Sequence, residues 1–369
     1  MSDVVLLETL PTACGRRFGL ATLNAPAGLN ALSLPMIRAL AAALEAWAED
    51  AGVVGVVLGG AGERAFCAGG DLRALYPALT PGTDAPSSEA RAFFAEEYAL
   101  DHRIHTYEKP ILCWGHGIVM GGGIGLMSGA SHRVVTRESR LAMPEISIGL
   151  YPDVGGSWLL RHLPGRVGLF LALTGVSINA ADALFCGLAD FALEAQQRAD
   201  LLEQLAGARW SDSSRTNGEA LSRMLSARSL HDLPESPVRR HLDLINSLVA
   251  GEDLLAISAR LHALRTDDPW LQSAVATFAK GSPTSVALAF ELWRRARHLS
   301  LAQVFRLEHD VSLHCCTQPE FAEGIRALLI DKDRKPRWQP ALLADVSAEV
   351  IEAHFRRSVE THPLARLGT

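Results

Sequence analysis

The sequence lacks an excess of basic residues, a cysteine framework and a long apolar run. Lys and Arg number 35 against 41 Asp and Glu, for a net charge of −6, so nucleic acid is not expected as a partner. The six cysteines form no CxxC pair, and their irregular spacing favours reduced thiols in a cytoplasmic protein. Glycines and a histidine interrupt residues 111–130, so no membrane span is expected, and residues 1–10 do not read as a signal peptide.

The chain is long enough for one large domain with a smaller one, or for two of ordinary size. It has 369 residues, of which 48% are hydrophobic and 21% charged, as is usual for a soluble globular protein. Apolar patterns predict strands at Val4–Glu8, Phe18–Leu23 and Val53–Gly60, the last buried on both faces. Between the last two, the segment "SLPMIRALAAALEAWAED", Ser33 to Asp50, reads as a helix with Ser33 as its N-cap. Strands alternating with helices predict an α/β architecture.

The sequence pattern changes after about Gly187, where segments typical of β-strands become rare. Long segments rich in Ala, Leu, Glu and Arg predict a mostly helical second half. We therefore divide the chain into a core of residues 1–195 and a helical region of residues 196–369. Within the second part, Ser211–Ala220 reads as a surface turn because it is rich in Ser, Asn and Gly.

The first candidate functional segment is "AFCAGGDL", Ala65 to Leu72, which follows the buried strand. Its two glycines allow a ligand to approach the backbone closely, and Asp71 reads as the cap of a following helix. The alternative is a tight turn from strand to helix with no ligand.

The second segment is a glycine cluster in "GHGIVMGGGIGLMSG", Gly115 to Gly129. Glycines at a helix start present backbone N–H groups to an anion, but the pattern is not a dinucleotide fingerprint because Leu126 occupies the sixth place. Close packing of helix on sheet is the alternative. His116 reads as a hydrogen-bonded core residue, and no group of His, Cys, Asp and Glu has the spacing of metal ligands.

The third segment, "MPEISIGLYPDVGG" at residues 143–156, sets Glu145 and Asp153 among apolar residues. Burying a carboxylate without a partner is costly, so two acids in such a segment are candidates for chemistry. Gly and Pro between them exclude a regular helix, and a loop that doubles back brings them together. The alternatives are structural: Glu145 as an acid in a first helical turn and Asp153 as the N-cap of the next helix.

Together the three segments resemble the crotonase (enoyl-CoA hydratase/isomerase) superfamily, in family order and after a matching opening stretch, "NAPAGLNALS". The chain is most similar to the 3-hydroxyisobutyryl-CoA hydrolase branch of that superfamily. The residues that carry this narrower resemblance are Glu96–Tyr98, Gly149–Gly156, Phe170–Gly175, Ser282–Ser285 and Glu323–Trp338.

The resemblance implies a spiral of ββα units for the core and, for residues 196–369, helices that cover the site, mediate oligomerisation or both. It implies hydrolysis of a short 3-hydroxyacyl-CoA, foremost 3-hydroxyisobutyryl-CoA in valine breakdown. Hydratases of the superfamily use two glutamates, and the first corresponds to Gly125 here, which transfers no proton. By the resemblance, Gly70 and Gly122 donate N–H groups to the oxyanion, Glu145 is nucleophile or general base, and Asp153 is the second acid.

The resemblance also assigns binding roles and leaves alternatives open. Glu97 contacts the substrate hydroxyl or holds the site together, unless it is a solvated helical acid, and the adenine of coenzyme A lies near Ala68. Coenzyme A enters as part of the substrate, with no metal or other cofactor, and related trimers and hexamers make a homo-oligomer compatible with the family. An enoyl-CoA hydratase or isomerase using Asp153, and a non-catalytic acyl-CoA-binding protein, are the rival interpretations.

Overall fold

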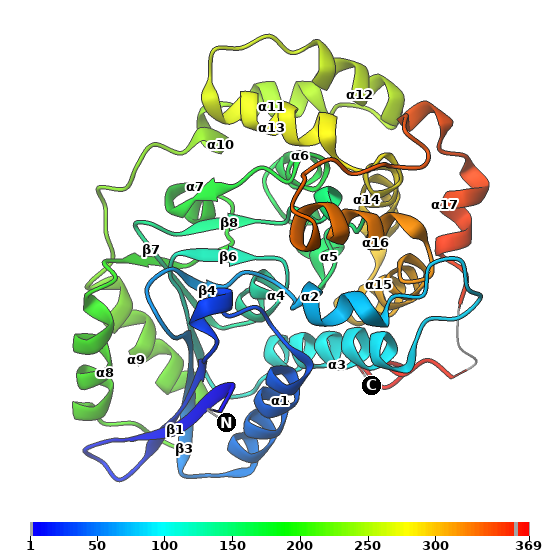
Figure 1. Cartoon of the computed structure of the whole chain (residues 1–369). Helices are drawn as coiled ribbons and strands as arrows, with labels where there is room; N and C mark the ends of the chain where they lie inside the picture. The colour runs from blue at the N-terminus through cyan, green and yellow to red at the C-terminus, as the bar shows by residue number, and fades with distance from the viewer. Residues whose placement is uncertain (1–2, 358–360, 369) are drawn as a thin grey trace. The chain divides into compact units, whose positions relative to one another are not determined.

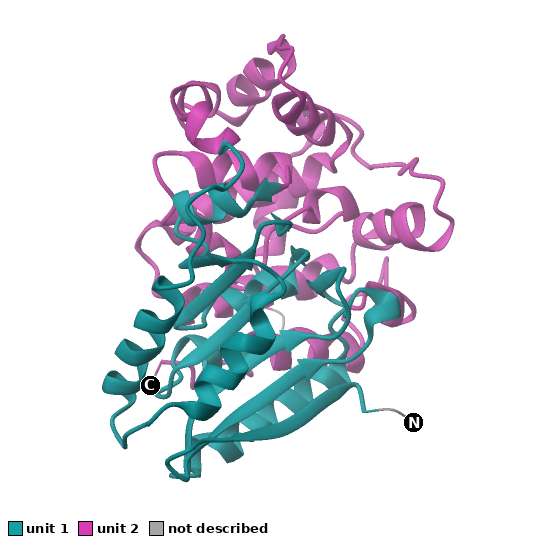
Figure 2. Ribbon diagram, turned by 90° about the vertical axis from the view of Figure 1, so that its left-hand side faces the viewer, with its two compact units in different colours: residues 1–70, 100–141, 178–236 teal, residues 71–99, 142–177, 237–369 magenta. Residues whose placement is uncertain are grey.

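The computed structural model describes residues 3–357 and 361–368, which form two compact units. Unit 1 contains residues 1–70, 100–141 and 178–236, and unit 2 contains residues 71–99, 142–177 and 237–369 (Figure 2). Each unit therefore gathers three separated segments of the chain. The division predicted at residue 195 is one cut along the sequence, and it does not follow these units.

Unit 1 consists of two sheets with helices packed on them (Figure 1). Its elements are β1 (Val5–Pro11), β2 (Arg17–Leu23), η1 (Pro26–Gly28), α1 (Leu34–Glu49), β3 (Val53–Gly60), β4 (Ala65–Cys67), β5 (Ile111–Gly115), β6 (Ile118–Met120), α4 (Gly122–Ser128), β7 (His132–Thr136), β8 (Arg140–Ala142, whose last residue belongs to unit 2), β9 (Ile178–Asn179), α7 (Ala180–Phe185), β10 (Phe191–Leu193), α8 (Gln197–Gly207) and α9 (Ser214–Ser226).

The larger sheet has the order β1-β2-β3-β5-β7-β10 and is parallel from β2 onward, whereas β1 pairs with β2 antiparallel. The smaller sheet has the order β4-β6-β8-β9. Along the chain, a strand of the larger sheet is followed by one of the smaller sheet and then by a helix, three times in succession. This is the spiral of ββα units that the resemblance implies.

The core of unit 1 lies on both faces of the larger sheet. On one face, apolar residues of α8 and α9 pack against the strands, with Phe18 and Trp210 rings meeting edge to face at 4.7 Å between centroids. On the other face, Leu40 and Leu44 of α1 line a small apolar gap with residues of β2 and β3. Every residue of β3 is buried, as its unbroken apolar run predicts.

Unit 2 is helical among its described residues. Its elements are α2 (Leu72–Leu75), η2 (Tyr76–Ala78), the first part of α3 (Ser88–His105, which enters unit 1 at residue 100), η3 (Glu145–Ile148), α5 (Gly156–Arg161), α6 (Val167–Thr174), α10 (Pro237–Arg240), α11 (Leu242–Leu248), α12 (Leu254–Ala263), α13 (Pro269–Lys280), α14 (Pro283–Arg295), η4 (Ala296–His298), α15 (Leu301–Cys315), α16 (Pro319–Ile325), η5 (Arg326–Ile330), η6 (Leu343–Asp345) and α17 (Ala348–His354).

The N-caps predicted from the sequence for α1 and α2 are confirmed. The Ser33 hydroxyl accepts from the Met36 N–H at the start of α1, and the Asp71 carboxylate accepts from the Ala74 N–H at the start of α2. The surface turn predicted at residues 211–220 is wrong, because Ser213 caps α9 and the helix begins at the next residue. Among the described residues, no helix is both long and apolar enough to cross a membrane.

Candidate active site

The two glycine segments come together in unit 1. β4 and β6 pair in parallel, so the segments that follow these strands lie side by side. The approach is close, since a Cβ on Gly123 would lie 2.4 Å from the Cys67 carbonyl oxygen. The pairing therefore puts Ala68 and Gly70 on one of two adjacent segments and Gly122 on the other.

Backbone hydrogen bonds fix the first of these segments. The Leu32 N–H donates to the Gly69 carbonyl at 2.8 Å, and the Ala68 N–H donates to a neighbouring carbonyl at 3.1 Å. Gly122 is the first residue of α4, and an N–H at that position has no partner inside its own helix. Gly121 before it has φ of +48°, a conformation that favours glycine.

Glu145 lies in unit 2 as the first residue of η3 and is 5% exposed. Its Oε2 is buried without a hydrogen-bond partner in the described part of the chain. Burial, and next the charge of Asp153, raise the pKa of Glu145 well above its usual range. The turn after η3 requires glycine, because Gly149 has φ of +75° and a Cβ there would lie 2.2 Å from the Glu320 carbonyl oxygen. The first-turn position predicted as an alternative for Glu145 is thus correct, and it is compatible with chemistry.

Asp153 is equally buried, and its carboxylate accepts a hydrogen bond from the Tyr98 hydroxyl at 2.7 Å. Burial raises the pKa of Asp153 to about 6, and the Tyr98 hydrogen bond opposes that rise. The alternative that made Asp153 a helix N-cap is wrong. Val154 and Gly155 both have positive φ, and this turn separates Asp153 from α5, whose N-cap is Gly155.

A chain of hydroxyl groups continues from Asp153 into the helices of unit 2. Ser312 on α15 places its Oγ 2.8 Å from the Tyr98 hydroxyl and 2.7 Å from the Tyr151 hydroxyl. The Tyr151 hydroxyl donates to the Glu308 carbonyl oxygen at 2.6 Å. The carboxylate of Asp153 is therefore oriented through two tyrosines and a serine, none of which was predicted as a site residue.

Glu308 is a further buried acid that the sequence analysis missed. Its two carboxylate oxygens accept from the Gly155 N–H at 2.7 Å and the Ser157 N–H at 2.9 Å, and its side chain is fully buried. Burial raises the pKa of Glu308 to about 8, against the effect of these donors. Glu308 thus holds the turn that follows Asp153.

Glu97, on α3, completes a group of four buried acids. Burial, and next the charge of Asp153, raise the pKa of Glu97 well above its usual range. Within residues 3–357 and 361–368, no Lys, Arg or His side chain pairs with Glu97, Glu145, Asp153 or Glu308. Like charges suppress each other's ionisation in such a group. The hydrogen bond from Tyr98 favours the ionised form of Asp153, which makes Asp153 the member of this group best suited to carry the negative charge.

One group of three side chains in unit 2 has the types of metal ligands: His309, Asp310 and His362. The hydrogen bonds of His362 disfavour a metal there. Its Nδ1 accepts from the Leu364 N–H at 3.0 Å, so the ring proton is on Nε2, which donates to the Arg306 carbonyl at 3.1 Å. His362 therefore offers this group a proton rather than a lone pair, and it does not fit a metal ion in this arrangement.

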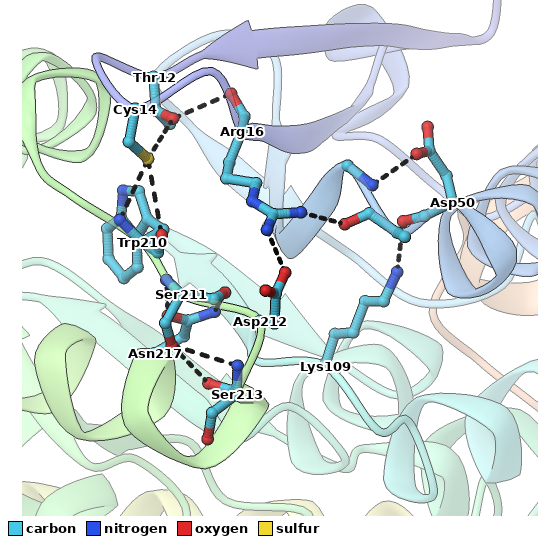
Figure 3. Close-up of polar contacts among 12 residues, drawn as sticks. Thr12, Cys14, Arg16, Asp50, Lys109, Trp210, Ser211, Asp212, Ser213 and Asn217 are labelled. Atoms are coloured by element: carbon cyan, nitrogen blue, oxygen red, sulfur yellow. Dashed lines mark hydrogen bonds and ion pairs between the residues drawn. The ribbon is translucent and has the colours of Figure 1, made fainter.

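Cys14 in unit 1 is the most reactive thiol by its surroundings (Figure 3). The Thr12 hydroxyl lies 3.3 Å from its Sγ, and the Trp210 N–H donates to Sγ at 3.2 Å. These contacts lower the pKa of Cys14 to about 7. The other five cysteines are buried, and all six are free thiols.

Comparison with known proteins settles the family. The sequence model for enoyl-CoA hydratase/isomerase matches residues 18–355. The chain belongs to this family. Curated relatives include "3-hydroxyisobutyryl-CoA hydrolase, mitochondrial" of Gallus gallus, 37% identical over 338 residues, which are 92% of this chain and 86% of that protein. The Homo sapiens protein of the same name is 35% identical, with the same coverage.

Solved structures support the same fold for this enoyl-CoA hydratase/isomerase family member. A carnitinyl-CoA dehydratase from Mycobacterium thermoresistibile has a TM-score of 0.85 and 35% identity, covering 98% of both chains. An enoyl-CoA hydratase from Rhodobacter sphaeroides has a TM-score of 0.82 and 36% identity, covering 96% of this chain and 98% of the other. The predicted fold class and family are confirmed. The roles predicted for Glu145, Asp153 and the other site residues stay predictions.

Proposed function

We propose that the protein hydrolyses the thioester of a short 3-hydroxyacyl-CoA, with 3-hydroxyisobutyryl-CoA as the physiological substrate in valine breakdown. The observation that carries the proposal is the buried acid pair of Glu145 and Asp153, combined with glycine at position 125, where the hydratases of the resemblance carry a glutamate. The curated relatives at 35–37% identity bear the name of this hydrolase, which supports the same substrate.

The surroundings of the two acids suggest a division of labour. We assign the negative charge to Asp153, which accepts the Tyr98 hydrogen bond, and the proton to Glu145, because burial and the charge of Asp153 raise the pKa of Glu145. The carboxylate of the pair takes a proton from water as the water oxygen bonds to the thioester carbon. The C–S bond then breaks, and the sulfur of coenzyme A takes a proton from the carboxyl group of the pair. The products are the free hydroxy acid and the thiol.

The remaining site residues keep the roles that the resemblance gave them. Gly70 and Gly122 donate N–H groups to the oxygen that becomes negative, and one such donor contributes roughly 3 kcal/mol to lowering the barrier in hydrolases. Glu97 contacts the 3-hydroxyl of the substrate, and Ala68 lies near the adenine. Each of these four assignments is a proposal.

The direct test is release of free thiol from a panel of acyl-CoA esters, including 3-hydroxyisobutyryl-CoA and 3-hydroxypropionyl-CoA. Replacing Glu145→Gln removes the proton carrier and is expected to lower kcat by roughly 100- to 10,000-fold. Glu89→Gln is the control, because it makes the same substitution at a glutamate that is exposed on α3. Thiol release that is equal in both variants would reject a catalytic role for Glu145.

Hydration of an enoyl-CoA is the second candidate, because the solved structures from Mycobacterium thermoresistibile and Rhodobacter sphaeroides are named as a dehydratase and a hydratase. Loss of double-bond absorbance from crotonyl-CoA, without thiol release, would establish it in place of hydrolysis. Binding of acyl-CoA with no turnover of any ester would indicate a non-catalytic acyl-CoA-binding protein instead of an enzyme.

We further propose a cytoplasmic location, a homo-oligomer in solution and catalysis without a metal or other cofactor. Six free thiols are compatible with a reducing compartment, although the names of the curated relatives include "mitochondrial". Cell fractionation, light scattering and activity after chelator treatment test the three statements separately.

A further inference from the structure

Unit 1 contains a pocket of about 380 Å³ at the carboxyl ends of its parallel strands. Its lining includes the last residues of β3 and β7, Gly60 and Thr136, and the residue that follows β5, His116. The volume lies within the range of small-molecule sites. None of the predicted catalytic or binding residues lines this pocket.

Arg198 of α8 lines the pocket and is the unusual residue in it. Its Nε is buried without a partner, and its side chain forms no hydrogen bond or ion pair within the described residues. A Cβ on Gly59 would lie 3.0 Å from its Nη2, so the guanidinium group lies against the backbone of β3. Because only Nε is both shielded and unpartnered, the terminal nitrogens are open to solvent in the pocket.

Two other arginines of unit 1 have acidic partners, which Arg198 lacks within the described residues. Arg133 pairs with Asp190 at 2.6 Å, and Arg137 pairs with Glu194 at 2.9 Å. Burial is the cause that lowers the pKa of Arg198, with no acid to offset it. A half-buried guanidinium remains charged at neutral pH, and leaving it without a counter-ion costs stability. An arginine in this position suits a protein in which an external anion supplies the missing partner.

The other walls restrict the kind of anion. His116 is buried and its Nε2–H donates to the Gly62 carbonyl at 2.9 Å; burial, with a contribution from Arg198, lowers the pKa of His116, so the ring is neutral. Glu63 and Glu138 line the pocket and are exposed. Their two negative charges repel a multiply charged phosphate more strongly than a carboxylate of single charge.

We propose that this pocket binds a small carboxylate of single charge, held by the guanidinium fork of Arg198. The planar fork matches a carboxylate in a bidentate arrangement. Trp114, which also lines the pocket, offers an aromatic wall for a short apolar body on the ligand. All residues that line this pocket belong to unit 1, whereas Glu145 and Asp153 belong to unit 2.

The test is isothermal titration of the full chain with sodium isobutyrate and, separately, sodium phosphate in a chloride buffer. Isobutyrate is expected to bind, and Arg198→Met to weaken it roughly 10- to 100-fold, as expected for losing hydrogen bonds to a charged group. The matched control is Arg223→Met on α9, where the arginine is exposed and lies in the same unit. This control is expected to bind isobutyrate as the unaltered protein does.

Stability separates a ligand-binding arginine from a structural one. Without ligand, Arg198→Met is expected to unfold at the same temperature as the unaltered protein or a higher one, because an unpaired buried charge has been removed. Arg198→Lys keeps the charge without the fork and is expected to bind isobutyrate weakly. Lower stability of Arg198→Met, phosphate binding as tight as isobutyrate, no heat from isobutyrate, or equal binding by Arg198→Met would each overturn the proposal.

Discussion

Replacing Tyr98→Phe tests whether the charge on Asp153 controls activity. The Tyr98 hydroxyl donates to Asp153 at 2.7 Å in a fully buried position, and this hydrogen bond opposes the rise in the pKa of Asp153 caused by burial. Phenylalanine keeps the ring in place but removes the donor. If the acid pair must carry one negative charge for catalysis, activity of the unaltered protein falls below a pH of about 6.

The size of the effect follows from the strength of one charge-assisted hydrogen bond. Such a bond contributes roughly 1.5 to 3 kcal/mol, and about 1.4 kcal/mol corresponds to one pH unit of titration. The acid limb of the pH–rate profile is therefore expected to move upward by about 1 to 2 pH units. At pH 6 this is a loss of roughly 5- to 50-fold, whereas at high pH the activity recovers.

The assay is kcat/KM for thiol release between pH 5 and pH 9. Tyr151→Phe is the control, because its hydroxyl bonds to Ser312 and the Glu308 carbonyl and not to Asp153. An acid limb that stays in place in Tyr98→Phe would refute the reasoning, as would an equal displacement in Tyr151→Phe. A uniform loss at all pH values would mean that Tyr98 positions the site and does not tune its charge.

Three further predictions concern other buried or reactive groups. Because the pKa of Glu308 is raised to about 8, the folded state holds the proton of this carboxyl group more tightly than the unfolded state does. The contribution of this proton to stability is complete below the unfolded pKa of 4.5 and is lost as the pH rises through 8. In urea unfolding, Glu308→Gln should therefore lose less stability than the unaltered protein between pH 5.5 and 8.5, and an equal loss would contradict this. Asp153→Asn should remove the acid limb near pH 6 and lower kcat by roughly 100-fold or more, as checked by thiol release. A thiol reagent at pH 7.5 should modify Cys14 first, which is expected as one rapidly reacting thiol per chain that is missing in Cys14→Ser. The reaction of Cys14 with the reagent adds to the signal of any thiol-release assay.

The elements predicted correctly are those with local signals. Ser33 and Asp71 sit one residue before their helices, and each side chain accepts an N–H from within the first turn, so a few adjacent residues contain the whole interaction. The same kind of signal was misread at residues 211–220. There Ser213 is a helix cap, and a polar cluster was taken for a turn because caps and turns prefer the same residues.

The catalytic segment was predictable as a motif but not as a chemical environment. Glu145 and Asp153 were identified from the residues around them, whereas the rise in their pKa values depends on burial and on contacts from distant helices. Ser312 lies 214 residues from Tyr98, and Glu308 lies 153 residues from Gly155. No local periodicity reports such pairings. A signal was present in α15, where Glu308 and Ser312 stand four residues apart on a buried helix, the spacing that puts two polar side chains on one face.

The threading of the chain through its two units has a consequence for synthesis on the ribosome. Unit 1 needs residues 178–236 for its complete contact set, and unit 2 gathers segments that begin at residue 71 and end at residue 369. Because α15 supplies Ser312 and Glu308, the hydroxyl chain around Asp153 closes only after most of the polypeptide has emerged. Until then Tyr98, Tyr151 and the acids are without their partners, and the nascent chain presents apolar helices of unit 2 to the surrounding medium. A translational pause or a truncation before residue 301 should therefore yield a chaperone-bound, inactive product rather than a smaller enzyme.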